Sequence, residues 1–376
     1  MPWHEVSTMS LRRELVMLAE QAGVNVRALC RRFGISPKTG YKWVHRFHAE
    51  GVGGLAERSR RPHHSPGCTP PHVAAPVLAV RDAHPAWGGR KIRARLQMLG
   101  QPVVPAASTV TAILRRAGRL NPADAAKHTP WQRFEQPVPN ALWQMDFKGH
   151  VALAAGRCHP LTVLDDHSRY ALCLQACTNE QGPTVQATLT TTFQRYGMPA
   201  RMLMDNGPPW GDDWEHPYTP LTVWLLRVGV GVCHGRPYHP QTQGKDERFH
   251  RTLTAEVLQR RLFCDLAECQ QAFAAWRDVY NCERPHEALG GAPPISRYTP
   301  SPRPFPMSLP PIEYRPGDVV RKVQHEGEFS FRGHTHRVSK AFRGYPIGLR
   351  ATDTDGVLDV YFSHHCISQL DLRKSP

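Results

Sequence analysis

The chain has 376 residues, 40% of them hydrophobic, and a formal net charge of +15. No apolar run approaches the roughly 18 residues that a membrane span needs, and the N-terminus lacks the charged-then-apolar order of a signal peptide, so we expect a cytoplasmic protein. The ten cysteines form no CxxC pair, which argues against a disulfide framework or a zinc ribbon. Residues 1–130 carry 20 of the 47 basic residues and only 7 of the 32 acidic ones, which predicts a polyanionic partner.

Residues 8–56 predict a helix-turn-helix domain. Short amphipathic stretches end at Gly23 and Gly34, and Ser36 followed by Pro37 is a strong helix start. A helix, a glycine-containing turn and a second, basic and aromatic helix form the DNA-binding helix-turn-helix pattern. The side chains expected to face the DNA groove are Lys38, Thr39, Tyr41, Lys42 and Arg46. The alternative is a plain three-helix bundle with a solvated basic face.

A basic linker and a second helical domain follow. Residues 57–71 are rich in Pro, Arg and His without periodicity, and such a linker can follow a phosphate backbone. His63, His64 and Cys68 lie in it, but they are a weak zinc candidate because no partner pair of ligands is near. Residues 72–120 predict short helices with basic residues on one face and apolar residues on the other, a second helix-turn-helix-like domain.

The remainder of the chain changes to strand-forming patterns. Over residues 135–300 short apolar runs alternate with helical segments, which predicts an α/β domain. Strands are expected at "LWQMDF", "PLTVLDD", "YALCLQA" and "RMLMD", and long helices from "QGKDERFHRTL" and in "LAECQQAFAAWRDVYN". After a proline-rich linker, residues 312–372 contain short strands typical of a small SH3-like β-barrel. The fold class is therefore multidomain, with all-α, α/β and all-β parts in that order.

Three acidic residues of the α/β part stand where strands end or a helix begins: Asp146, Asp205 and Glu247. If the two aspartate strands are parallel neighbours, their carboxylates meet at one end of the sheet. Such a cluster repels itself unless cations are present, and carboxylate oxygens suit Mg²⁺ or Mn²⁺. Two such ions about 4 Å apart can activate a water or a 3′-hydroxyl for attack on a phosphodiester.

Simpler roles are open for each of these acids. An aspartate after a strand is often a loop cap, and an acid at a helix start compensates the helix dipole. The same region also contains the pairs Asp165-Asp166 and Asp212-Asp213, and spacing alone does not exclude them as catalytic acids.

The segments "MDFKGH", "LMDNGPPW" and "YHPQTQGKDERFHRTL" resemble the DDE catalytic core of retroviral-integrase-like transposases from bacterial insertion sequences. "LTVLDDHSRY" and "YNCERPHEALGGAPP" are similar to further stretches of that family. The resemblance also extends to the tandem helix-turn-helix domains and, more loosely, to the C-terminal barrel. It implies a ribonuclease-H-like core in which Asp146, Asp205 and Glu247 bind two divalent ions, Mg²⁺ with Mn²⁺ as a substitute. The Gln-Gly-x-x-Glu pattern that starts at Gln243 makes Glu247, and not Asp246, the third acid.

A helical wheel separates the adjacent acids Asp246 and Glu247, because neighbouring helix residues point about 100° apart. Asp246 lies on the stripe of Phe249 and Leu253, which should face protein, and Glu247 lies on the opposite side. The residues of this helix expected to hold DNA phosphates are Lys245, Arg248 and Arg251, unless they form an ordinary solvated face.

The resemblance implies a transposase that binds the terminal inverted repeats of a mobile element. It would cleave double-stranded DNA at the element ends with metal ions and transfer the freed 3′-hydroxyls to target DNA, as a dimer or larger assembly on the nucleoid. The main alternative is a helix-turn-helix DNA-binding regulator with an inert integrase-like domain. A metal-dependent nuclease that cuts without joining is a second one.

Overall fold

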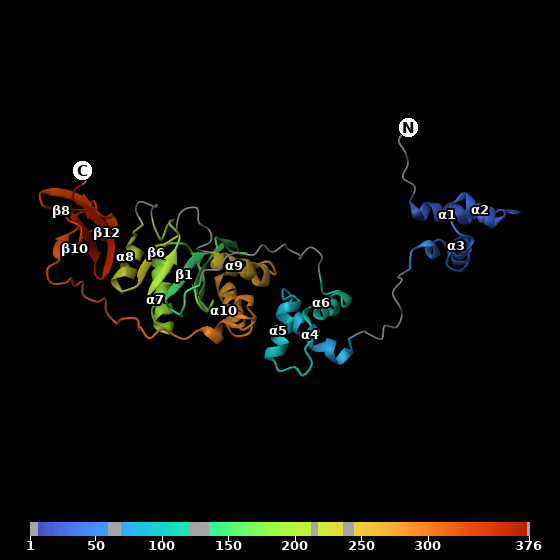
Figure 1. The fold of residues 1–376 in the computed structure, drawn as a ribbon, viewed down its shortest axis with the longest axis horizontal. Helices are drawn as coiled ribbons and strands as arrows, with labels where there is room; N and C mark the ends of the chain where they lie inside the picture. The colour runs from blue at the N-terminus through green and yellow to red at the C-terminus, as the bar shows by residue number, and fades with distance from the viewer. Residues whose placement is uncertain (1–6, 59–68, 121–134, 212–216, 236–243, 374–376) are drawn as a thin grey trace, which may run out of the picture. The chain divides into compact units, whose positions relative to one another are not determined.

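A computed structural model describes residues 7–58, 69–120, 135–211, 217–235 and 244–373. The chain divides into two compact units, residues 1–68 and residues 69–376, whose elements are labelled in Figure 1. Among the described residues, every helix is too short or too polar to cross a lipid bilayer.

The N-terminal unit consists of three helices, as predicted: α1 (Thr8–Ala19), α2 (Val26–Arg32) and α3 (Pro37–Glu50), followed by the 3₁₀ turn η1 (Gly51–Leu55). The predicted helix start is confirmed, because the Ser36 hydroxyl accepts a hydrogen bond from the Thr39 backbone N–H and Pro37 lies in the first turn. Trp43 is buried between the helices. This burial turns one face of α3 inward and leaves Lys38, Tyr41 and Lys42 exposed on the other.

The second unit begins with another three-helix module, α4 (Pro71–Ala83), α5 (Gly89–Met98) and α6 (Ala107–Arg116). Trp87, Ile92 and Leu114 form part of its buried core. The helices agree with the prediction for residues 72–120. The predicted basic linker lies mostly outside the described residues, and the weak zinc candidate His63, His64 and Cys68 lies entirely outside them.

A mixed sheet forms the centre of the second unit. Its strands are β1 (Leu142–Phe147), β2 (Val151–Ala152), β3 (Arg157–Asp165), β4 (Ala171–Cys177), β5 (Arg201–Met204) and β6 (Gly231–His234). The order is β2–β3–β1–β5–β6, with β4 also paired to β3. β1, β5 and β6 run parallel, and β3 is antiparallel to β1 and β4. The four strands predicted from apolar runs are all present.

Helices cover both faces of this sheet. On one face α7 (Gly182–Tyr196) and α8 (Pro220–Arg227) pack on Trp143 and Met145 of β1. On the other face lie α9 (Gly244–Leu253), its π-helical continuation η4 (Thr254–Leu258) and α10 (Leu266–Cys282). The 3₁₀ turns η5 (Glu287–Leu289) and η6 (Pro294–Arg297) follow. Because strand side chains alternate, Gln144 and Asp146 lie on the α9 face of β1.

The C-terminal residues form β-structure, as predicted. The strands are β7 (Val319–Lys322), β8 (Glu328–Phe331), β9 (His334–Arg337), β10 (Pro346–Ala351), β11 (Val357–Phe362) and β12 (His365–Asp371), with the 3₁₀ turn η7 (Lys340–Phe342) before β10. They pair as a sheet β12–β11–β10–β7 and a hairpin β8–β9. This order does not close on itself within the described residues, so the predicted barrel is not confirmed. Strand β12 was not predicted, since none of its side chains is buried and it lacks an apolar run.

Candidate active site

The pairing of β1 with β5 brings two of the predicted acids together. The strands are parallel, with Leu142, Trp143 and Gln144 opposite Arg201, Met202 and Leu203. Continued by two residues, this register sets Asp146 beside Asp205. The sequence analysis predicted that the two carboxylates meet if their strands are parallel neighbours, and the structure shows that the strands are parallel neighbours. Buried Trp143 and Met145 fix the face of β1, so that Asp146 emerges on the α9 side.

The electrostatics of this pair are those of crowded, partly buried carboxylates. Burial, and then the charge of Asp205, raises the pKa of Asp146 to about 7. Burial also raises the pKa of Asp205, against one hydrogen bond of 3.2 Å from the backbone N–H of Gly207. The site therefore has more negative charge than its donors compensate. A site that offers only carboxylate oxygens and carries uncompensated negative charge fits a hard divalent cation.

Glu180 is a fourth acid near this pair, and the sequence analysis missed it. It lies just before α7 and pairs with His159 of β3, whose Nδ1 is 2.9 Å from its carboxylate. Its charge contributes to the raised pKa values of both Asp146 and Asp205. No spacing rule singles out Glu180, because only the tertiary fold brings this loop to the strand ends.

His250 of α9 stands against Asp146, with 3.9 Å between its Nδ1 and the carboxylate. Its Nε2 is 2.9 Å from the Thr162 hydroxyl, and that hydroxyl donates to the backbone carbonyl of Asp146. Since the single hydroxyl hydrogen is used there, the imidazole Nε2 must donate to Thr162. Burial lowers the pKa of His250 to about 4, so a neutral ring faces the carboxylate.

Helix α9 separates Asp246 from Glu247 as the helical wheel predicts. Asp246 is fully buried with Phe249 and Leu253, whereas Glu247 is exposed. Neither carboxylate oxygen of Asp246 has a hydrogen-bond partner among the described residues. Burial, followed by the charges of Asp146 and Asp166, raises the pKa of Asp246 far above its usual range. Its surroundings thus disfavour the charged form of this carboxyl.

The third predicted acid does not complete a metal site in this arrangement. Among the described residues, no three Asp, Glu, His or Cys side chains converge closely enough to hold an ion. Glu247 is nevertheless near enough for its charge to add a little to the raised pKa of Asp146. Gln243, the first residue of the predicted pattern, lies outside the described residues.

The predicted DNA-contacting side chains have different surroundings. Arg248 and Arg251 of α9 are exposed. On α3, Thr39 and Arg46 are half-buried, while Lys42 and Arg46 lie over the Trp43 ring at 4.1 and 5.2 Å. Lys245 differs from the other cations, because its ammonium already forms an ion pair with buried Asp166.

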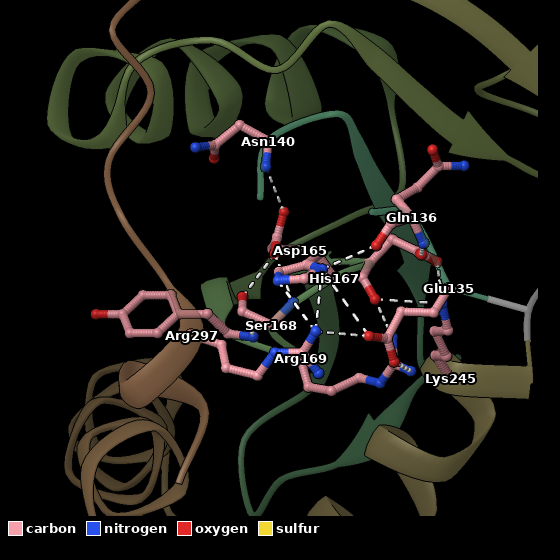
Figure 2. Close-up of polar contacts among 11 residues, drawn as sticks. Glu135, Gln136, Asn140, Asp165, His167, Ser168, Arg169, Lys245 and Arg297 are labelled. Carbon is pink, nitrogen blue, oxygen red and sulfur yellow. Dashed lines mark hydrogen bonds and ion pairs between the residues drawn. The ribbon is translucent and has the colours of Figure 1, made fainter. Parts of the chain in front are cut away.

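Asp165 belongs to a polar network around the β3–β4 turn (Figure 2), and the next residue, Asp166, accepts hydrogen bonds from Gln136 and Gln144. Asp165 accepts hydrogen bonds from the Asn140 N–H and from the N–H and hydroxyl of Ser168, at 2.6 to 2.8 Å. Glu135 joins the network through Arg169 and Arg297, at 2.9 and 2.8 Å. This turn is thus a structural element, and Asp212-Asp213 lie outside the described residues.

Comparison with protein families assigns each part of the chain. Models of the integrase core domain match residues 136–240 and 228–294, and the model of the IS481 family transposase C-terminal domain matches residues 318–376. A helix-turn-helix domain model matches residues 11–63, and a homeodomain-like domain model matches residues 39–114.

Two relatives are proteins of insertion elements. The chain is 29% identical over 157 residues to the uncharacterized 39.2 kDa protein of IS476 from Xanthomonas euvesicatoria, covering 42% of this chain and 44% of that protein. It is 29% identical over 152 residues to the uncharacterized 31.7 kDa protein of IS407 from Burkholderia multivorans, covering 40% and 53%. The matched region is thus about half the length of these relatives. The catalytic core domain of BIV integrase matches 42% of this chain and 92% of its own length, with 24% identity and a TM-score of 0.33.

Proposed function

We propose that this chain is an integrase-core transposase of an insertion sequence, which binds the terminal inverted repeats of a mobile element and catalyses cleavage and strand transfer at its DNA ends. The activity is that of a DDE polynucleotidyl transferase dependent on two divalent ions. The observation that carries the proposal is the meeting of Asp146 and Asp205 on adjacent parallel strands, where their charges are not compensated.

Asp146, Asp205 and Glu247 would hold the two ions, with Mg²⁺ as the expected metal and Mn²⁺ as a substitute. Bound divalent ions supply Lewis acidity to the attacking oxygen and stabilise the leaving oxygen of a phosphodiester. The protein's own part is to hold the carboxylates in place. Behind Asp146, the Thr162 hydroxyl donates to its backbone carbonyl and accepts from His250, which fixes the backbone there, and the neutral imidazole adds no charge that would compete with a cation.

DNA binding is assigned to two surfaces. Exposed Arg248 and Arg251 flank Glu247 on α9 and would hold phosphates beside the reacting strand. The N-terminal domain would read the element end through Lys38, Thr39, Tyr41, Lys42 and Arg46 of α3. Joining two ends requires two sites at once, so we propose a dimer or larger assembly on DNA, located on the nucleoid.

The domain boundaries that go with this function are those predicted from the sequence. We propose 8–56 and 72–120 for the two helix-turn-helix domains, 57–71 for the linker between them, 135–300 for the catalytic core and 312–372 for the C-terminal β-domain, predicted as a barrel.

The test is Mg²⁺-dependent cleavage and joining of a labelled duplex that carries the inverted repeat flanking the gene. Wild type, Glu247→Gln and Asp246→Asn are compared. We expect wild type and Asp246→Asn to join ends and Glu247→Gln to be inactive. Binding of the repeat by wild type without cutting or joining, with either Mg²⁺ or Mn²⁺, would instead identify a DNA-binding regulator with an inert core.

A further inference from the structure

The first turn of α9 is fastened to the sheet by a buried ion pair. The ammonium of Lys245 contacts Oδ1 of Asp166 and lies 3.2 Å from the Asp166 carbonyl oxygen. The Asp166 side chain is 0% exposed and that of Lys245 only 17%. A lysine this enclosed is already bound within the protein, unlike the exposed Arg248 and Arg251 of the same helix.

Asp166 in turn is fixed by groups from β1 and from the segment before it. Its Oδ1 also accepts a hydrogen bond of 2.6 Å from the Gln144 side-chain amide, and its Oδ2 accepts one of 2.8 Å from the backbone N–H of Gln136. Its own backbone N–H donates to the Leu142 carbonyl at 2.9 Å. A carboxylate with this many fixed donors has little freedom to move.

The positions of these partners in the chain give the pair its significance. Lys245 is two residues before Glu247 on α9, and Gln144 is two residues before Asp146 on β1. The buried carboxylate of Asp166 therefore links Lys245 to Gln144, and each of these lies two residues before an acid that the proposed function assigns to the metal site. Asp246 is the buried residue between Lys245 and Glu247, and at about 100° per residue these two lie on opposite flanks of the helix, so an anchored Lys245 sets the direction in which Glu247 leaves the other flank.

We propose that Lys245 and Asp166 are positioning residues, which set the rotation of α9 and thereby hold Glu247 in place relative to Asp146. This inference rests on the proposed function, because it assigns the pair a task at that site. Partners of this kind, one shell away from metal ligands, typically change metal affinity or activity by about 10- to 100-fold when removed. If Lys245 instead contacts a DNA phosphate, its removal should weaken DNA binding and leave metal binding unchanged.

The experiment measures Mn²⁺ binding to the full-length, DNA-free protein by isothermal titration calorimetry. It compares wild type with Lys245→Met, Lys245→Arg and the surface control Lys340→Met. Lys340 pairs with Glu326 where both side chains are more than half exposed, so its removal breaks an ion pair far from any ligand. DNA affinity is measured in parallel in EDTA, and circular dichroism checks that each variant is folded.

We expect Lys245→Met to weaken Mn²⁺ binding at least about tenfold, with DNA affinity in EDTA changed less than twofold. Lys245→Arg should recover most of the loss, and Lys340→Met should match wild type. Unchanged Mn²⁺ affinity in folded Lys245→Met overturns the inference, and a loss confined to DNA affinity assigns Lys245 to phosphate contact. If Lys245→Met does not fold, Gln144→Met takes its place with the same expectations. A wild-type protein that binds no Mn²⁺ contradicts the proposed function itself.

Discussion

Two pairs of aspartates in the same α/β domain have opposite surroundings. Asp165 and Asp166, at the β3–β4 turn, are buried and receive hydrogen bonds from several fixed donors each. Asp146 and Asp205, at the ends of β1 and β5, face each other with few donors, and the pKa of Asp146 is raised to about 7. The first pair holds a turn and a helix together, whereas the second has charge to offer a cation. The number of hydrogen-bond donors, and not residue type or burial alone, distinguishes the acids of the structural network from the pair proposed to bind metal ions.

The largest effect is expected at the unsatisfied pair. Asp146→Asn or Asp205→Asn should lower the rate of DNA cleavage by about 10³-fold or more, because a lost metal ligand forfeits several kcal/mol of stabilisation in the transition state.

The same Asp146→Asn change should stabilise the metal-free fold. The raised pKa means that wild type loses stability as pH rises from the unfolded-state value toward 7, and asparagine removes that loss. Cleavage rates and urea unfolding at pH 5 and pH 8 measure both. If the Asp146→Asn protein still cleaves DNA, Asp146 is not a metal ligand and the contrast drawn between the two pairs is wrong.

The donor-rich pair should respond in the opposite sense. Asp166→Asn removes the buried carboxylate charge that pairs with the ammonium of Lys245, which should cost about 3 to 5 kcal/mol of unfolding free energy. Urea denaturation followed by circular dichroism measures this loss. The matched change Asp353→Asn, at an exposed loop position, should leave the unfolding free energy within about 0.5 kcal/mol of wild type. If Asp166→Asn is as stable as that control, the network does not have the structural role given to it.

Asp246 combines features of both pairs. It is buried, as Asp166 is, but it has few hydrogen-bond donors around it, as is the case for Asp146. Asp246→Asn should raise the unfolding free energy by about 1 to 3 kcal/mol at pH 8 and should leave end joining within a few-fold of wild type. A raised folded-state pKa gives stability that is complete below the unfolded-state pKa and is lost as pH rises. The advantage of the asparagine variant should therefore be small at pH 4 and should grow toward pH 8. An advantage that is the same at pH 4 and pH 8 would mean that folding does not shift the pKa of Asp246.

The smallest effect is expected at the exposed cations of α9. Arg251→Ala should weaken binding to all DNA sequences about equally, by a few-fold, and should reduce the slope of log affinity against log salt by about 1. Fluorescence anisotropy at several salt concentrations measures the slope. Arg195→Ala, an exposed change on α7 at the other face of the sheet, is the control and should leave the slope unchanged. A sequence-dependent loss for Arg251→Ala would indicate a base contact.

The sequence determined the local features of this protein. Apolar alternation predicted the core strands, Ser36-Pro37 predicted the start of α3, and the helical wheel predicted which of Asp246 and Glu247 is buried. These depend on neighbours within a few residues along the chain, and so a linear pattern contains them. Strand β12, in which no side chain is buried, left no such pattern and was missed.

Only the tertiary structure decided which acids meet and which are satisfied. Asp146 and Asp205 come together through a parallel pairing that spacing permits but does not require, and Glu180 and His250 reach the same place from other elements. Lys245 has the same sequence context as Arg248 and Arg251, but burial against Asp166 gives it a partner within the protein. Hydrogen-bond donors, burial and Coulomb interactions act through space, and the order of residues along the chain does not specify them until the fold has formed.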